Sequence, residues 1–142
     1  MKVVLLEPGH EALLARAEAE FNPDPPSAER CAMLLREPSY VMIVALSDAD
    51  QVMGRIYGNV LHRYAATDLL LYEVDVAQEH QRKGVGRAMI EYLKELSAKR
   101  GYSEMWVLTD VDNDAGNGVY RAAGGVLENS PANMYVFHIS KS

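Results

Sequence analysis

The sequence predicts a single α/β domain (α+β in some schemes) in which a mixed central sheet is flanked by helices. Two strand-like segments, residues 69–76 and 104–109, are separated by apolar positions at helical spacing, at residues 85, 88, 89, 92, 93 and 96. A helix that joins two strands in this way makes them parallel, with a right-handed crossover. Hairpins expected before and after this unit make the sheet mixed. At 142 residues the chain has the usual size of one domain, so we expect one domain over residues 1–142.

The elements before the crossover follow from apolar spacing and turn residues. Residues 3–6 predict a short strand, and apolar positions 13, 14, 17 and 21 predict a helix that the proline-rich residues 22–26 end. Ser27 is expected to cap a second helix through residues 31–35. Residues 40–46 and 51–61 form a predicted hairpin around the turn residues 47–50. The proline-rich joint is short and lies between two helices, so it is a loop and not a domain boundary.

The elements around and after the crossover end on glycine. A helix is expected over residues 84–99, where Lys99, Arg100 and Gly101 are suited to its C-terminus. A weaker helix from about residue 114 to residue 123 ends at Gly124-Gly125. Residues 134–139 predict a last strand.

The charge of the chain is unevenly distributed. Its net charge of −6 argues against a general nucleic-acid binder, which needs a basic surface. Residues 79–101 carry six basic and three acidic groups, a net charge of +3, so the rest of the chain carries −9. We expect an anionic ligand at the basic segment and a cationic partner elsewhere.

Several classes of site and location are excluded. Cys31 is the single cysteine, so no intramolecular disulfide and no thiolate zinc site can form, and we expect a buried structural thiol. The four histidines lack metal-ligand spacing, and Asp110–Asp114 fails as a calcium loop because Ala115 and Arg121 replace its glycine and glutamate. No stretch reaches the length of a spanning helix or a signal-peptide core. We therefore expect no metal, no membrane partner and a cytoplasmic location.

A glycine loop lies directly between the strand at 69–76 and the amphipathic helix. In residues 81–87 (QRKGVGR) glycines let backbone N–H groups approach an anion, the helix adds its positive end, and Arg82, Lys83 and Arg87 add charge. This combination suits a pyrophosphate, although a plain turn before a solvated basic helix start has the same pattern. A Walker loop does not match, and Met89 stands where a dinucleotide fingerprint needs its third glycine.

The same loop, Gln81-Arg82-Lys83-Gly84-Val85-Gly86, resembles Q/R-x-x-G-x-G/A, the coenzyme A pyrophosphate signature of the GCN5-related N-acetyltransferase (GNAT) superfamily. The downstream segment Asn113-x-x-Gly116-x-x-Val119-Tyr120-x-x-x-Gly124 is similar to a second motif of that family, and the predicted order of elements matches nearly the whole chain. The resemblance implies the GNAT fold, acetyl-CoA as cosubstrate and direct acetyl transfer to an amine.

One branch is particularly similar. Residues 71–76 (LYEVDV) and 79–84 (EHQRKG) resemble the gentamicin-type aminoglycoside 3-N-acetyltransferases, which carry Y-D-L-A-V and E-H-R-R-x-G there. Four residues depart from the branch pattern, namely Glu73, Asp75, Gly116 and Gly125. These departures concern the substrate more than the coenzyme.

The resemblance assigns roles to residues of this chain. Glu73 is the first candidate for the base that deprotonates the amine, with Asp75 on the same strand face as the other; pairing of Glu73 with an arginine such as Arg55 is the structural alternative. Tyr120 corresponds to the tyrosine that protonates the departing thiolate, or else it is a core tyrosine. The expected substrate-binding carboxylates are Glu73, Asp75, Asp110 and Asp112.

The expected coenzyme contacts come from two segments of the chain, a strand end and the glycine loop, and from the side chain of Asn113. The strand backbone of Val74, Asp75 and Val76 is expected to pair with the pantetheine arm. Asn113 is expected to contact the pantetheine or simply to cap a helix. The pyrophosphate is expected on the loop residues Gln81, Arg82, Lys83, Gly84, Val85, Gly86 and Arg87.

The acidic residues favour a small cationic amine, and within the resemblance an aminoglycoside antibiotic, as acceptor. Another small amine, a polyamine or a peptide or protein amine remains open, and so does a coenzyme A-binding protein without catalysis. A homodimer is expected only by analogy with the family.

Overall fold

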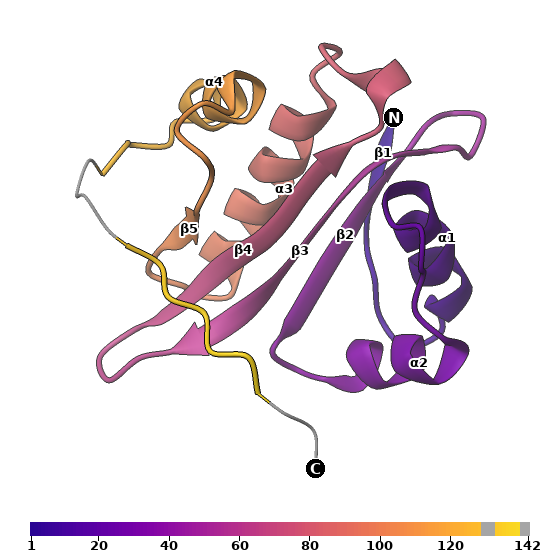
Figure 1. Ribbon diagram of the computed structural model, residues 1–142, viewed down its shortest axis with the longest axis horizontal. Coiled ribbons are helices and arrows are strands. Elements are labelled where there is room, and N and C mark those ends of the chain that lie inside the picture. Colours follow the sequence, from indigo (N-terminus) through magenta and orange to yellow (C-terminus); the bar gives the residue numbers. More distant parts are fainter. Residues whose placement is uncertain (129–132, 140–142) are drawn as a thin grey trace.

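The computed structural model describes residues 1–128 and 133–139 and has a five-stranded sheet in chain order, β1-β2-β3-β4-β5 (Figure 1). The strands are β1 Lys2–Leu5, β2 Tyr40–Leu46, β3 Val52–His62, β4 Thr67–Val76 and β5 Met105–Val107. The helices are α1 Glu11–Phe21, α2 Ala28–Arg36, α3 Val85–Lys99 and α4 Asp114–Ala122, with a short 3-10 turn, η1, at Gln78–His80. Neighbouring strands are antiparallel except β4 and β5, which are parallel. The predicted mixed sheet and crossover helix are confirmed.

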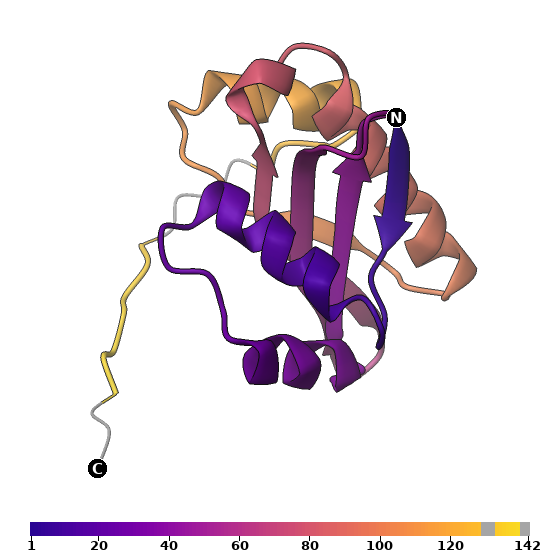
Figure 2. The same ribbon diagram turned by 90° about the vertical axis from the view of Figure 1, so that its right-hand side faces the viewer.

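The helices cover the two faces of the sheet separately (Figure 2). Strand β2 is buried on both faces, so its continuous apolar sequence serves two cores. Val41, Ile43 and Ala45 belong to the core beneath α3, whereas the alternate residues of β2 pack with α1 and α2. The predicted Ser27 cap is confirmed, because the Ser27 hydroxyl accepts a hydrogen bond from the Arg30 N–H at 3.1 Å.

A β-bulge in β4 decides which of its side chains face which helix. Tyr57 of β3 is paired with Glu73 and Gly58 with Leu71, so Tyr72 is the extra residue. As a result Leu71 and Val74 both pack on the α3 side, although simple alternation would put them on opposite faces. Glu73 and Asp75 lie on the other face, towards α1. Gly58 accommodates the bulge, because a Cβ there would overlap the Leu70 carbonyl oxygen.

The predicted strand at residues 134–139 is wrong for the single chain. Residues 133–139 carry no strand pairing within the described ranges, and they run away from the sheet (Figures 1 and 2). A segment of high β propensity forms a strand only where it can pair with a sheet edge. Residues 133–139 do not pair with β5, the edge strand of the same chain. No helix among the described residues is long and apolar enough to cross a membrane.

Candidate active site

The candidate site lies where β4 and β5 separate. The two strands pair only at Leu69–Leu71 with Met105–Val107, and β4 then continues to Val76 without pairing to β5. A cavity of about 420 Å³ opens at this point between β4, β5, α1 and α4. It is lined by five predicted site residues: Glu73, Val74, Asp75, Asn113 and Tyr120.

Three carboxylates converge on one buried arginine at this cavity. Arg55 of β3 is fully buried, and its guanidinium lies 2.7 Å from Glu73, 3.0 Å from Asp75 and 3.2 Å from Glu18 of α1. The contact to Glu73 is also an aligned hydrogen bond. One positive and three negative groups give the cluster a net charge of −2 when all are ionised. Glu73 and Asp75 line the cavity together with Arg55, whereas Glu18 is buried and is not among the lining residues.

Aromatic rings enclose the arginine. The guanidinium carbon of Arg55 lies 5.2 Å from the ring centroids of Phe21 and Tyr57, within the range of cation–π attraction. Tyr57 in turn stacks on Tyr72 with their ring centroids 5.5 Å apart. The two rings and the three carboxylates together restrict the orientation of the guanidinium group.

Burial perturbs the acidity of two carboxylates in the cluster. Desolvation raises the pKa of Glu18 above its usual value, against the opposing effect of Arg55. The pKa of Asp75 is also raised, first by burial and further by the charge of Glu73, while Arg55 again opposes the shift. The neighbouring charge of Glu73 thus raises the pKa of Asp75, as expected for paired carboxylates, but desolvation raises it more. Asp75 is a better proton acceptor than an ordinary aspartate.

Tyr120 lies on α4 and lines the same cavity. Burial raises the pKa of its hydroxyl, and the nearby charge of Asp75 raises it further. The phenol therefore stays protonated at neutral pH, as a proton donor must. The alternative interpretation as a core tyrosine is partly met, because Tyr120 also packs against the core under α3.

The glycine loop has the backbone conformation of an anion-binding turn. Gly84 is the N-cap of α3 with a left-handed φ of 81°, and Arg82 also has a positive φ of 63°. Residues 81–84 are exposed, and the first hydrogen bond within α3 runs from the Ala88 N–H to the Gly84 carbonyl. The Gln81 N–H donates to the Gln78 carbonyl, whereas the first N–H groups of α3, before Ala88, have no partner within the helix and can bind a ligand. An exposed turn of this form, beside the unpaired part of β4, fits a pyrophosphate with an extended arm.

Two loop residues also have structural roles. The Gln81 side chain donates a hydrogen bond to the Val76 carbonyl at 3.2 Å, which ties the loop to the end of β4. Gly86 is buried, and a Cβ there would come within 3.3 Å of Val119 of α4. Absence of a side chain at Gly86 therefore permits close packing of α3 on α4.

Of the site residues predicted after β5, Asn113 lines the cavity, whereas Asp110 and Asp112 do not. Asn113 caps α4, since its Oδ1 accepts from the Gly116 N–H at 3.1 Å, while its Nδ2 donates to Thr109 at 2.8 Å. Within the described part of the chain, Asp110 and Asp112 are exposed and do not line the cavity. Their contact with substrate stays a prediction.

Sequence reasoning missed Glu18 and the aromatic wall of Phe21 and Tyr72. A signal for Glu18 was present, because it lies four residues after Leu14 and three before Phe21, on the apolar face of its helix. A carboxylate at a buried helical position needs a cationic partner. Arg55 was foreseen only as an alternative partner of Glu73.

Comparison with known proteins agrees with this geometry. Residues 8–124 match the model of the Acetyltransferase (GNAT) family. The chain belongs to this family. The family consists of acetyltransferases that use acetyl-CoA, and the match spans both segments on which the resemblance was based, the glycine loop and the segment from Asn113 to Gly124. Among the described residues, no group of three or more His, Cys, Asp or Glu side chains is arranged to hold a metal ion.

Solved GNAT structures share the whole fold. An aminoglycoside acetyltransferase from an uncultured soil metagenomic sample, in complex with sisomicin, is 20% identical with a TM-score of 0.88, over 96% of this chain and 95% of that one. A second soil metagenomic aminoglycoside acetyltransferase is 25% identical with a TM-score of 0.78, over 96% and 98% of the two chains.

A curated relative shares part of the sequence. The [ribosomal protein bS18]-alanine N-acetyltransferase of Escherichia coli (strain K12) is 27% identical over 71 residues. This match covers 50% of the GNAT chain described here and about half, 48%, of the relative.

Proposed function

We propose that this GNAT protein is an acetyl-CoA-dependent N-acetyltransferase whose acceptor is a small polycationic amine of the aminoglycoside type. The observation that carries the proposal is the convergence of Glu18, Glu73 and Asp75 on the single cation Arg55 at the cavity. The two carboxylates Glu73 and Asp75 outnumber the one cation Arg55 at the cavity wall, so the wall attracts an acceptor with several ammonium groups and repels an anionic one. Likeness to two metagenomic aminoglycoside acetyltransferases supports the same acceptor class.

The residues at the cavity can move the protons that acetyl transfer requires. Acetyl-CoA supplies the acetyl group as a thioester, and the acceptor must lose a proton before its nitrogen can attack. Glu73, 40% exposed at its side chain, is the proposed acceptor of that proton, directly or through water, with Asp75 beside it as the alternative. Tyr120 is the proposed donor of a proton to the departing thiolate.

The coenzyme is proposed to lie along the unpaired part of β4 and over the glycine loop. The backbone of residues 74–76 can pair with the amide groups of the pantetheine arm, as an added strand pairs with a sheet edge. The exposed N–H groups of the loop and Arg82, Lys83 and Arg87 can hold the pyrophosphate. This division explains the two charge regions, because the basic segment serves the coenzyme and the acidic cluster serves the acceptor.

A panel assay tests the acceptor class. The purified protein is supplied with acetyl-CoA and with gentamicin, sisomicin, spermidine or a peptide with an N-terminal alanine, and release of free thiol is measured. We expect turnover with the aminoglycosides, and mass spectrometry with NMR of the product to place the acetyl group on the 3-amino position. Acetylation at another amino group would refute the 3-N assignment alone.

A protein or peptide amine is the second candidate, because part of the chain is 27% identical to an enzyme that acetylates an alanine of a ribosomal protein. Turnover of the alanine peptide without turnover of any aminoglycoside would establish this alternative. Coenzyme A binding in calorimetry without turnover of any amine would instead indicate a non-catalytic binding protein.

A further inference from the structure

Glu18 is a buried carboxylate behind the wall of the candidate active site. It lies on α1, its side chain is 9% exposed, and its Oε1 lies 3.2 Å from Nε of Arg55. Its other carboxylate oxygen accepts a hydrogen bond from the side-chain amide of Asn22. Both contacts favour the ionised carboxylate, which burial by itself disfavours. Glu18 therefore places a negative charge beneath the cavity, and the proton transfers proposed above do not use it.

Arg55 connects Glu18 with the two carboxylates that line the cavity. Its Nε faces Glu18, its Nη2 donates a hydrogen bond to Glu73 at 2.7 Å, and its Nη1 lies 3.0 Å from Asp75. Among the described residues, Nε and Nη1 have no aligned hydrogen-bond acceptor. The contacts of Arg55 with Glu18 and Asp75 are therefore contacts between charges. Charges interact over several ångströms, so a change of charge at Glu18 alters the electrostatic field at Asp75.

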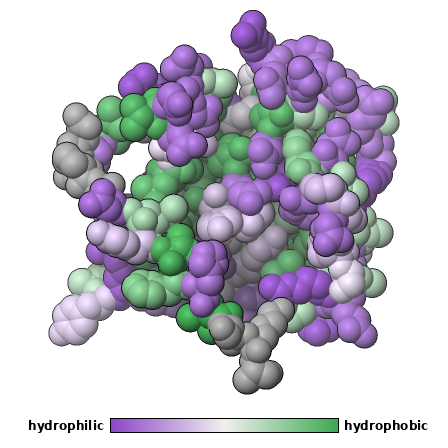
Figure 3. Space-filling model, viewed as in Figure 1, coloured by the Kyte–Doolittle hydropathy of each residue, from purple (hydrophilic) through white to green (hydrophobic). Residues whose placement is uncertain are grey.

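The cavity opens on the face of the sheet that α1 covers. Figure 3 shows this face hollowed near its middle, between α1 on one side and β5 and α4 on the other. The side chains of Glu73 and Asp75 are 40% and 44% exposed, so an acceptor amine can reach them. Arg55, with a side chain 1% exposed, and Glu18 lie beneath them. The cluster thus has an accessible pair of carboxylates above a buried ion pair.

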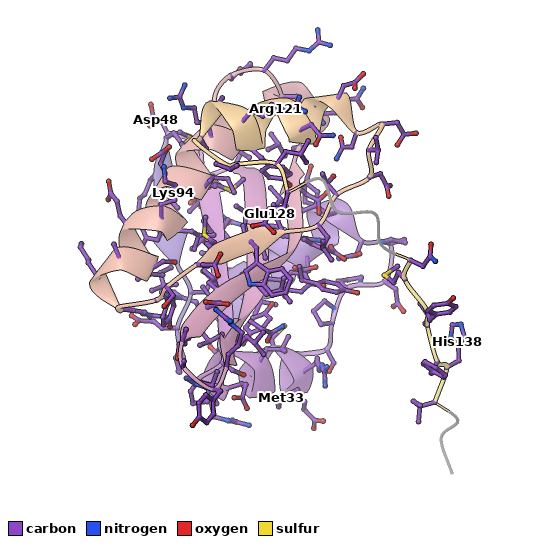
Figure 4. All side chains as sticks on the ribbon, turned by 90° about the vertical axis from the view of Figure 1, so that its left-hand side faces the viewer. Met33, Asp48, Lys94, Arg121, Glu128 and His138 are labelled. Atoms are coloured by element: carbon purple, nitrogen blue, oxygen red, sulfur yellow. The ribbon has the colours of Figure 1, made fainter. Side chains whose placement is uncertain are left out.

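The other titratable groups around the cluster are a thiol and four phenols, which ordinarily titrate above neutral pH. They come from every element packed against it: Cys31 of α2, Tyr40 of β2, Tyr57 of β3, Tyr72 of β4 and Tyr120 of α4. Burial raises the pKa of the Cys31 thiol and of the Tyr57 and Tyr120 phenols. Figure 4 shows Lys94 of α3 on the side of the molecule opposite His138, where its Nζ donates to the Ala123 carbonyl at 2.8 Å. Within the described ranges, Arg55 is therefore the cation that the three carboxylates share.

We propose that Glu18 is a positioning residue that, through Arg55, sets how readily the carboxylates of the cavity accept a proton. The negative charge of Glu18 offsets part of the positive field of Arg55, so Glu73 and Asp75 retain more of their basicity. Without that charge, Arg55 attracts the two cavity carboxylates more strongly and makes them weaker bases. The role of Glu73 as proton acceptor belongs to the proposed function, on which the kinetic part of this inference rests.

The first test measures Asp75 directly and needs no acceptor amine. Glu18→Gln removes the charge and keeps the size of the side chain, and its amide oxygen can still accept from Asn22. The full chain is isotope-labelled at the aspartate carboxyl carbons, and the NMR signal of Asp75, assigned by its loss in Asp75→Asn, is followed against pH. We expect its titration midpoint to fall in Glu18→Gln by about 0.5–1 pH unit, less than the roughly 1–3 units of a charge in direct contact.

The matched control is Glu20→Gln, because Glu20 lies on the same helix but is exposed. The same change of charge at an exposed position is screened by solvent and salt, so it should leave the Asp75 midpoint unchanged. An unchanged midpoint in Glu18→Gln, or an equal shift in Glu20→Gln, would overturn the proposal.

The second test measures the pH dependence of turnover with an acceptor from the amine panel. The acidic limb of kcat/KM at saturating acetyl-CoA should move to lower pH in Glu18→Gln, and kcat above that limb should fall by roughly 3-fold because the base is weaker. The KM for acetyl-CoA should stay the same, because the coenzyme is proposed to bind at β4 and the glycine loop and not at α1. A reduced kcat with an unshifted acidic limb would indicate a purely structural role and overturn the proposal.

A second variant, Glu18→Asp, separates charge from packing. It keeps the charge in a shorter side chain, whereas Glu18→Gln keeps the size and loses the charge. The acidic limb of Glu18→Asp should therefore stay closer to that of the unchanged protein, and the opposite order would overturn the proposal. Absence of turnover with every amine would instead refute the proposed function, and the titration of Asp75 would then decide this inference alone.

Discussion

Replacement of Arg55 by methionine tests whether this arginine holds the acidic cluster together. The change keeps the apolar stem and removes the charge, which leaves Glu18 with a side chain only 9% exposed and no cation beside it. Loss of one partner from a buried ion pair costs about 3–5 kcal/mol. The contacts to Glu73 and Asp75 add about 0.5 kcal/mol each, since those side chains are 40% and 44% exposed and partly screened.

The expected total is therefore about 5 kcal/mol of unfolding free energy, or roughly 15–20 °C in melting temperature for a domain of this size. Urea and thermal unfolding followed by circular dichroism measure it. The matched control is Arg16→Met, because Arg16 pairs with Asp50 at 3.1 Å on the surface, where both side chains are exposed. The control is expected to cost at most about 1 kcal/mol.

The loss should also depend on pH, with a defined sign. Without Arg55 the main opposing effect is lost, whereas burial and the neighbouring carboxylates still raise the pKa values of Glu18 and Asp75, so these rise further above the unfolded ones. Between the unfolded and the folded pKa the folded chain binds more protons, so its stability falls as pH rises through that window. Arg55→Met is therefore expected to lower the free energy of unfolding more at pH 7.5 than at pH 5. Urea unfolding of both proteins at the two pH values measures this difference.

A double-mutant cycle supplies the result that would refute this reasoning. Arg55→Met combined with Glu18→Gln removes the unpaired buried charge, so the double variant should be less destabilised than the sum of the singles by about 1–3 kcal/mol. A loss below about 1 kcal/mol for Arg55→Met would show that the cluster does not depend on this cation, and strict additivity with Glu18→Gln would show that Glu18 and Arg55 are not coupled.

Three further outcomes are expected. Glu73→Gln should lower kcat by about 100-fold or more with unchanged coenzyme A affinity by calorimetry, whereas full activity at every pH would exclude it as the base. Gly84→Ala should lower the free energy of unfolding in urea by about 1–2 kcal/mol, because a left-handed φ is costly for alanine. Its control is Gly118→Ala, in the interior of α4 with open space around its Cβ, which should raise that free energy by up to about 1 kcal/mol. Equal effects of the two changes would contradict this. Cys31 is fully buried and its thiol pKa is raised by burial, so it should react with a thiol reagent only in urea, and rapid labelling of the native protein would count against its structural role.

Much of the fold could be predicted because it depends on local periodicity. The predicted strand at residues 40–46 and the helix carrying the apolar stripe are both present, and Gly84 is the N-cap of α3, at the helix start that the loop pattern implied. Each depends on residues within a few positions of one another, where spacing alone sets the face that is buried. The shared face of Glu73 and Asp75 was predictable for the same reason.

The convergence of charges at the site was not predictable in this way. Glu18 and Arg55 lie 37 positions apart, and their contact depends on how α1 packs across the sheet. The bulge at Tyr72 also changes which side chains of β4 face α3, and it follows from pairing with β3 and from Gly58 rather than from the β4 sequence.

The amino-acid sequence by itself determined the crossover unit and the glycine loop, because both depend on short-range spacing, and the resemblance of its motifs indicated the acetyltransferase family. Tertiary structure alone decided that Arg55 gathers three carboxylates beside the cavity and that residues 133–139 form no strand pairing within the described ranges. Such contacts depend on register and packing between distant segments, and local spacing carries no record of either.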